Sequence, residues 1–165
     1  MSPTLNVGTS GMRRRREAGF TMVEVLVALV VLAIGLLGIA ALYLNSLQSG
    51  RTAIYRTQAV NLAADLADRI RANRTAQNAY ATAFADAEAE VAGCYTTFGC
   101  IDSDLASTDL ARWKATLAQL LPNGAGQVAF TAPVGAGEPA TYVITVRWVE
   151  AGEAAPITFQ IGFQT

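Results

Sequence analysis

Residues 13–44 read RRRREAGFTMVEVLVALVVLAIGLLGIAALYL, a block of four arginines followed by a long apolar run. The twenty residues from Val25 to Leu44 contain no charged side chain. As a helix that rises 1.5 Å per residue they would extend about 30 Å, the thickness of the hydrocarbon core of a membrane. A buried helix of a soluble domain is usually shorter and carries a polar stripe, so this run predicts a membrane-spanning helix.

The distribution of basic residues predicts the orientation of this helix. Four arginines precede the apolar run, whereas Arg51 and Arg56 are the first basic residues after it. Because basic residues favour the cytoplasmic side, we expect residues 1–19 in the cytoplasm and the C-terminal part across the membrane. A secretory signal peptide would have a shorter apolar core followed by a small-residue cleavage site. Residues 45–50 offer no such site, and the small residue that stands out is Gly19, ahead of the run.

The residues at this junction follow a specific order: a glycine, a phenylalanine, a glutamate four positions later, and then the apolar run. Residues 19–29, GFTMVEVLVAL, resemble the class III leader junction of type IV pilins and related pseudopilins. In that family a prepilin peptidase cuts after the glycine on the cytoplasmic face, and the new N-terminal phenylalanine is methylated. The resemblance implies that Gly19 is the last leader residue and that Phe20 is the N-methylated first residue of the mature chain.

Glu24 is the one acidic residue between this cleavage position and the end of the apolar run. Insertion scales put a carboxylate within hydrocarbon at a cost of at least about 2.5 kcal/mol, so such a residue is a candidate functional site. In the pilin family this glutamate neutralises the N-terminal amine of a neighbouring subunit as it docks into a filament. The resemblance therefore implies an assembly contact at Glu24. The alternative is that its side chain reaches back to the level of the lipid headgroups.

The remainder of the chain predicts a mixed α and β domain. Apolar residues at helical spacing extend the N-terminal helix through 51–74, and a second helix is expected over 108–121, capped by Ser107 or Thr108. Strand-like segments follow at Gln127–Thr131, Thr141–Glu150 and Ile157–Phe163. We therefore predict an α+β, type IV pilin-like fold, in which the long N-terminal helix packs on a small antiparallel sheet.

Cys94 and Cys100 are the two cysteines of the chain, and both follow the membrane helix. On the exported side of a membrane they predict one disulfide that closes a short loop. A closure of this size stabilises a domain by about 2–3 kcal/mol. The chain has no histidine and the five-residue spacer is not C-x-x-C, which argues against zinc and against redox catalysis. We expect no metal site and no cofactor.

The composition also argues against an enzyme. Histidine, the commonest general base, is absent, and no G-x-S-x-G, P-loop or dinucleotide-binding fingerprint is present. Lys114 is the only lysine, so a serine–lysine pair remains formally open, and we expect no catalytic residue. Without residues 1–19 the chain keeps eight of twelve basic residues and twelve of thirteen acidic ones, a net charge of −4. DNA is therefore not expected as the main partner.

Several later segments resemble one subfamily of pilins. They are residues 68–74 (DRIRANR), 109–113 (DLARW) and 121–124 (LPNG), together with the paired cysteines. All are similar to the PilV-type minor pilins, also called type IV pilus modification proteins. This resemblance implies a minor pilin that takes part in initiating pilus assembly and in pilus-dependent adhesion or motility. Its partners would be the prepilin peptidase, other minor and major pilins, and the pilus assembly platform.

Two alternatives remain open. A minor pseudopilin of a type II secretion system would use the same leader chemistry, and an uncleaved, membrane-anchored periplasmic binding module would carry the same helix. For a pilin we expect a cytoplasmic leader at 1–19, a transmembrane and assembly half of the helix at 20–50, and a periplasmic head at 51–165. The protein would move from the inner membrane to the pilus at the cell surface. The arginines of residues 69–74 either bind an acidic partner or form a solvated helix end.

Overall fold

A computed structural model describes residues 19–96, 99–135 and 137–165. Its elements are, in order, α1 (Met22–Ala72), η1 (Arg74–Tyr80), α2 (Asp102–Leu120), β1 (Ala125–Thr131), β2 (Thr141–Trp148) and β3 (Ile157–Gln164). The chain divides into two compact units, the first ending at Asn45 and the second running from Ser46 to Thr165. Apart from Gly19, the predicted leader lies outside the described residues.

The first unit contains the beginning of α1. The hydroxyl of Thr21 accepts the backbone N–H of Glu24 at 3.3 Å, which satisfies one of the N–H groups that the first turn leaves without a partner. Every residue of α1 up to Asn45 is exposed, including the apolar ones. By length and composition, α1 can cross a membrane once.

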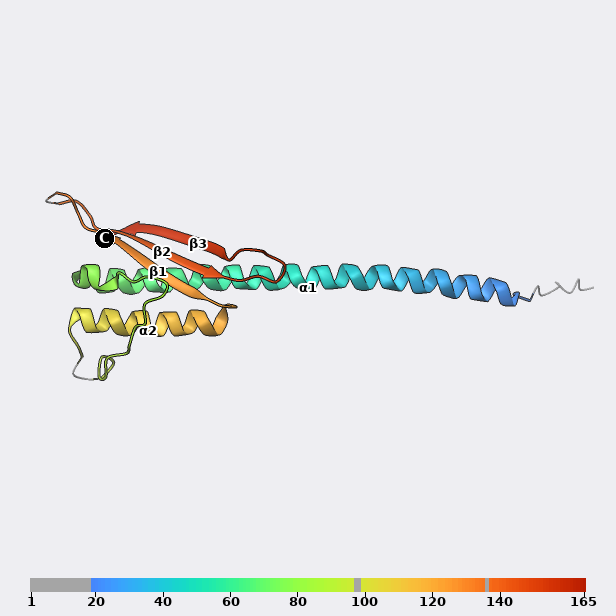
Figure 1. The fold of residues 1–165 in the computed structure, drawn as a ribbon, viewed down its shortest axis with the longest axis horizontal. Coiled ribbons are helices and arrows are strands. Elements are labelled where there is room, and N and C mark those ends of the chain that lie inside the picture. Colours follow the sequence, from blue (N-terminus) through green and yellow to red (C-terminus); the bar gives the residue numbers. More distant parts are fainter. Residues whose placement is uncertain (1–18, 97–98, 136) are drawn as a thin grey trace, which may run out of the picture. The chain divides into compact units, whose positions relative to one another are not determined.

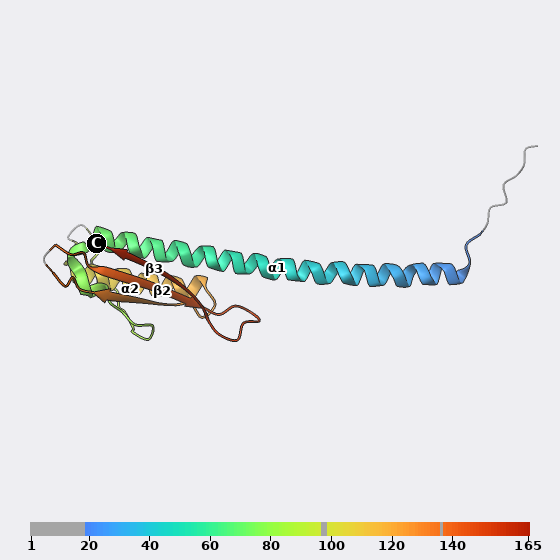
Figure 2. The ribbon, with the colours of Figure 1, turned by 90° about the horizontal axis from the view of Figure 1, so that it is seen from above.

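In the second unit α1 has one buried face. Its buried residues recur at helical spacing: Ala59, Ala63, Leu66, Ala67 and Ile70. The alanines let other elements approach the helix closely, and α2 does so. The indole Nε1 of Trp113 donates a hydrogen bond to the backbone carbonyl of Leu62 at 3.0 Å. Figure 2 shows the sheet lying along this C-terminal part of α1.

α2 begins six residues earlier than the sequence predicted, at Asp102. The prediction of Ser107 or Thr108 as the cap is wrong because Thr108 is buried within the helix, where its hydroxyl accepts the backbone N–H of Val91 at 2.9 Å. The first turn of α2 carries the carboxylates of Asp102 and Asp104 instead. These negative charges are stabilised by the positive end of the helix dipole.

The three strands form an antiparallel sheet in the order β1-β2-β3, as Figure 1 shows. Each strand lies within two residues of its predicted bounds. The apolar face predicted for β2 is confirmed, because four alternating residues of this strand are buried in the core: Tyr142, Ile144, Val146 and Trp148. The sheet therefore packs its central strand against the helices of the second unit.

Gly126 allows β1 to approach α2. A Cβ at this position would collide with the ring of Trp113 and the side chain of Leu117, so a larger residue would push the strand from the helix. The resulting architecture is α+β, with a long N-terminal helix packed on a three-stranded antiparallel sheet. The predicted fold class is confirmed.

Candidate functional site

The predicted processing junction lies immediately before α1. Gly19, Phe20 and Thr21 precede the helix, and the side chain of Phe20 is 82% exposed. A Cβ added at Gly19 would meet nothing within 4 Å. Packing within the described residues therefore does not require a glycine here. A requirement for glycine at this position would come from a second molecule that binds the junction.

Glu24 lies in the first turn of α1 and is exposed. Together with Phe20 it borders a shallow groove whose other lining residues are apolar: Val25, Ala28, Leu29 and Leu32. Within residues 19–96, 99–135 and 137–165, no side chain forms a hydrogen bond or ion pair with its carboxylate. A carboxylate on an apolar surface of this kind can bind a cationic group that a second molecule provides.

Cys94 and Cys100 form a disulfide, and their Cα atoms lie 4.8 Å apart. The closed loop carries Tyr95, whose ring lies 4.0 Å from the guanidinium carbon of Arg112. The Tyr95 hydroxyl donates a hydrogen bond to Oδ1 of Asp109 at 2.7 Å. The disulfide thus holds one aromatic side chain against α2, which is a structural role.

Asp109 is the centre of a polar cluster, called here the Asp109 cluster, that also contains Arg69, Tyr80 and Tyr95. The residue is 5% exposed. Besides the bond from Tyr95, its carboxylate accepts hydrogen bonds from Nη1 of Arg69 and the hydroxyl of Tyr80, each at 2.9 Å. Burial of a carboxylate is tolerated when charged and polar donors surround it in this way. The cluster joins α1, η1, α2 and the disulfide loop.

Three members of the Asp109 cluster, Arg69, Tyr80 and Tyr95, have raised pKa values. Burial opposes the charge of Arg69, but hydrogen bonds to Asp109 and Asp65 outweigh it and raise the pKa of the guanidinium. Burial, reinforced by the charge of Asp109, raises the pKa of Tyr80 and the pKa of Tyr95. Both tyrosines therefore keep their protons and act as donors.

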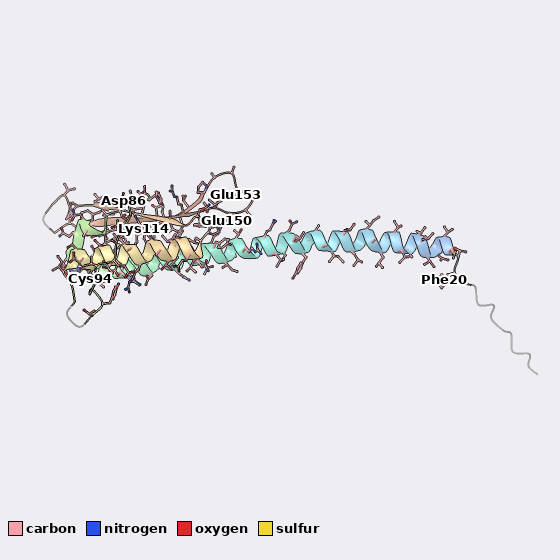
Figure 3. The ribbon with its side chains drawn as sticks, turned by 60° about the horizontal axis from the view of Figure 1, so that its bottom comes forward. Phe20, Asp86, Cys94, Lys114, Glu150 and Glu153 are labelled. Carbon is pink, nitrogen blue, oxygen red and sulfur yellow. A yellow bond between two sulfur atoms is a disulfide. The ribbon has the colours of Figure 1, made fainter. Side chains whose placement is uncertain are left out.

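Lys114 holds the irregular segment that follows η1. Its Nζ donates to the backbone carbonyls of Ala83 and Asp86, both at 2.8 Å, and to the hydroxyl of Thr82 at 2.6 Å. Three acceptors match the three N–H groups of an ammonium, although burial lowers the pKa of Lys114. Lys114 and Asp86 are both labelled in Figure 3. Among the described residues, the hydroxyl that contacts this amine is that of Thr82.

The arginines near the end of α1 are paired within the chain. Arg69 bonds to Asp109 and Asp65, and Nη1 of Arg71 lies 2.6 Å from Oδ1 of Asp68. These ion pairs neutralise much of the charge that the sequence places at 69–74. They favour the interpretation of this segment as a helix end held by its own carboxylates.

Glu150 is a residue that the sequence analysis missed. It is 7% exposed, and its carboxylate accepts hydrogen bonds from Nε1 of Trp148 at 2.9 Å and from the hydroxyl of Thr52 at 3.0 Å. It therefore fastens the end of β2 to α1. The available signal was the spacing of Trp148 and Glu150, because residues two apart in a strand share one face. Across the part of the chain that the structure describes, no group of three His, Cys, Asp or Glu residues could hold a metal ion.

Two protein families match the chain. Residues 14–40 match the prokaryotic N-terminal methylation motif, and residues 41–111 match the family described as type IV pilin Tt1218. The chain is a type IV pilin-like protein. Neither a curated protein nor a solved structure matches it significantly. The sheet, which begins at Ala125, lies beyond both matched regions.

The two matches indicate what the junction at Gly19 is for. The leader motif of this pilin-like protein implies processing by a prepilin peptidase and assembly with other pilins. The motif and the exposed apolar helix together indicate a membrane-anchored pilin. Pilins are structural proteins, and the contacts of the Asp109 cluster and of Lys114 have the same character: they fix one segment of the second unit to another.

Proposed function

We propose that this pilin-like protein is a minor pilin of a type IV pilus, cut after Gly19, methylated at Phe20 and assembled through the exposed half of α1. The observation that carries the proposal is the exposure of every helical residue as far as Asn45, nearly all of them apolar. A contiguous apolar surface of this size requires a cover. A membrane covers it before assembly, and the helices of neighbouring pilins cover it in the filament.

Glu24 sets the register of docking in this proposal. Cleavage after Gly19 would create an amine at Phe20, at the edge of the groove that Glu24 borders. A buried carboxylate or ammonium carries a penalty of several kcal/mol when it is alone, and pairing with an opposite charge offsets that penalty. Pairing between Glu24 of one subunit and the Phe20 amine of its neighbour would therefore favour one axial position over the others.

The proposed function includes a membrane topology, which is based on the basic residues of the sequence. The arginines before α1 favour a cytoplasmic leader at 1–19, a transmembrane and assembly segment at 20–50 and a periplasmic head at 51–165. The disulfide agrees with this placement, because such bonds persist in oxidising compartments. In the mature protein the head would reach the cell surface as part of the pilus.

The assignment as a minor pilin rests on the resemblance to PilV-type proteins. Two of the segments that carry it, 68–74 and 109–113, meet in the second unit, where Arg69 bonds to Asp109 at 2.9 Å. The resemblance therefore includes residues whose side chains link α2 to α1. Partners in this role are the other minor and major pilins and the assembly platform.

Substitution of Glu24 by Ala tests the proposed docking contact. We expect the amount of the variant in sheared filaments to fall about tenfold or more, since an unpaired amine would be buried at each docking event. Its amount in the membrane should not change. Glu153→Ala removes an exposed carboxylate from the second unit and serves as the matched control. Undiminished incorporation of Glu24→Ala would contradict the docking role.

Deletion of the protein distinguishes the pilus from the secretion alternative. A minor pilin predicts loss of surface pili and of twitching motility, with exoprotein release unchanged. Blocked exoprotein release with normal pili would identify a pseudopilin of a type II secretion system instead.

A further inference from the structure

The two edge strands of the sheet differ in whether another segment of the chain pairs with them. At the edge formed by β1, Val128 exchanges two backbone hydrogen bonds with Thr82, at 2.9 and 3.0 Å. Thr82 belongs to the segment that Lys114 holds in place. At the opposite edge the order of the sheet ends with β3, and no described segment pairs with the outer side of this strand. Figure 1 shows β3 as the border of the sheet.

The backbone groups that point outward from β3 can be identified from the ladder. Ala140 and Thr165 exchange hydrogen bonds at 3.0 and 3.1 Å, and bonded and non-bonded pairs alternate along antiparallel strands. Along the register, the residues that bond to β2 are Ile157, Phe159, Ile161 and Phe163. The residues that direct N–H and C=O outward are Thr158, Gln160, Gly162 and Gln164, and all four are exposed.

The outer edge of β3 lacks the usual protection against further pairing. Edge strands are normally blocked by charged residues, proline, a bulge or a covering segment. The sequence of β3, ITFQIGFQ, contains no charge and no proline, and the strand pairs with β2 residue for residue. Its eight residues extend for about 26 Å, which is long enough to template another strand.

The side chains of β3 define the pattern of a partner. One face of the strand carries an apolar row that packs against the core and is still partly exposed: Ile157, Phe159, Ile161 and Phe163. Side chains of adjacent strands lie beside one another on the same face of a sheet. A strand added to this edge would therefore cover the row best with apolar residues at every second position.

We propose that the outer edge of β3 binds an extended segment of a different subunit of the filament, which adds a fourth strand to the sheet. The occupant is a polypeptide because another extended backbone matches a row of N–H and C=O groups at alternate residues. The open edge is a property of the sheet itself, whereas the origin of the partner in a filament rests on the proposed function.

A second copy of this chain fits the edge less well. In the second unit, α1 lies along the sheet (Figures 1 and 2). If two copies paired antiparallel through β3, these helical segments would point in opposite directions. Copies that repeat along one filament all point the same way, so the proposed filament does not accommodate this two-fold pairing, and the partner strand comes from a different subunit.

Two substitutions at Gln160 test the edge in the full-length protein. Gln160→Pro removes an outward N–H and places a ring in the path of the added strand, while the bonds of Phe159 and Ile161 to β2 remain. Gln160→Ala keeps the backbone and is the matched control. We expect about tenfold less of the proline variant than of the alanine variant in sheared filaments. Thermal melting of both full-length variants in detergent checks the fold, and Gln160→Lys gives a second test with an unaltered backbone.

Photo-crosslinking identifies the occupant without depending on filaments. A photo-reactive phenylalanine analogue is placed at Gln160 of the full-length protein in membranes, and at exposed Leu120 of α2 as a control. The proposal predicts an adduct from position 160, absent from position 120, that maps to an alternately apolar segment of another pilin-like subunit. An adduct between two copies, or none with a different pilin-like subunit, would overturn it.

The two readouts separate failure of the edge from failure of the proposed function. Equal incorporation of the proline, lysine and alanine variants, in filaments that contain the wild-type protein, would overturn the edge proposal. If the wild-type protein is missing from filaments while the adduct at 160 forms with another pilin-like subunit, the edge proposal stands and the proposed function fails.

Discussion

The two halves of α1 are built from the same backbone but obtain their stability from different sources. As far as Asn45 every residue is exposed, and the chain provides no cover for a surface rich in valine, leucine and isoleucine. Beyond Ser46 the buried face is narrow and consists mainly of alanines, together with Leu66 and Ile70. The second half is covered by α2 and the sheet.

In the proposed function, the first half is the one that exchanges partners. A helix that buries its apolar face within its own domain has one stable environment. A helix that is apolar on all sides can move from lipid to the helices of other subunits, because both environments are apolar. Processing at Gly19 and pairing at Glu24 would act on the first half, while the second unit determines what the subunit presents.

A pair of leucine substitutions gives the largest expected effect. Leu66 is fully buried in the second half, so Leu66→Ala should lower the free energy of unfolding of this unit by about 2–5 kcal/mol. Leu37 is 72% exposed in the first half, and Leu37→Ala should leave that free energy unchanged. Both tryptophans, Trp113 and Trp148, lie in the second unit, so their fluorescence during denaturation in detergent reports on it. Equal effects of the two substitutions would contradict the contrast between the halves.

Removal of the disulfide should have a smaller effect on the second unit alone. The double variant Cys94→Ser and Cys100→Ser should lose about 2–3 kcal/mol, because the unfolded chain is no longer constrained by the loop. Insertion of α1 in the membrane should be unaffected. Chemical denaturation of both proteins measures the difference. Tyr95→Phe, which removes the hydrogen bond to Asp109 and the longer one from Arg69, should cost about 1 kcal/mol. The idea that the bridge holds the loop fails if the double variant is as stable as the wild type.

The pH dependence of stability should be the smallest effect, and it arises in the Asp109 cluster. Folding raises the pKa of Tyr80 above its ordinary value of about 10. The protonated Tyr80 hydroxyl therefore stabilises the folded state, and this contribution is complete below about pH 10. It is lost as pH rises from there toward the raised pKa, because Tyr80 of the unfolded chain releases its proton at lower pH than Tyr80 of the folded chain. Between about pH 9.5 and 11, the free energy of unfolding should fall more steeply in the wild type than in Tyr80→Phe. Identical slopes would exclude a contribution from this hydroxyl.

The sequence predicted those elements that local periodicity determines. The long helix follows from its apolar run, and β2 follows from the alternation that ends at Trp148, because each pattern contains its own period. The beginning of α2 could not be predicted in this way. Thr108 has the chemistry of a cap, but its hydroxyl is used by Val91, seventeen residues earlier in the chain.

The polar contacts of the second unit were also beyond sequence reasoning. Asp109 meets Arg69 across a separation of forty residues, and Glu150 meets Thr52 across ninety-eight. Nothing in the local pattern of any of these residues specifies its partner. The candidate site at the junction is the opposite case, because Gly19, Phe20 and Glu24 lie within six residues of sequence and can be recognised without knowing any distant contact.

The mass of the mature N-terminus in sheared pili tests the central claim most directly, since it reports cleavage, methylation and incorporation in one measurement. We predict that the protein is present in the pilus fraction, that its chain begins at Phe20, and that the terminal peptide carries one additional methyl group. A chain that keeps Met1 or the arginines of residues 13–16 would contradict the account. Such a result would favour an uncleaved membrane anchor.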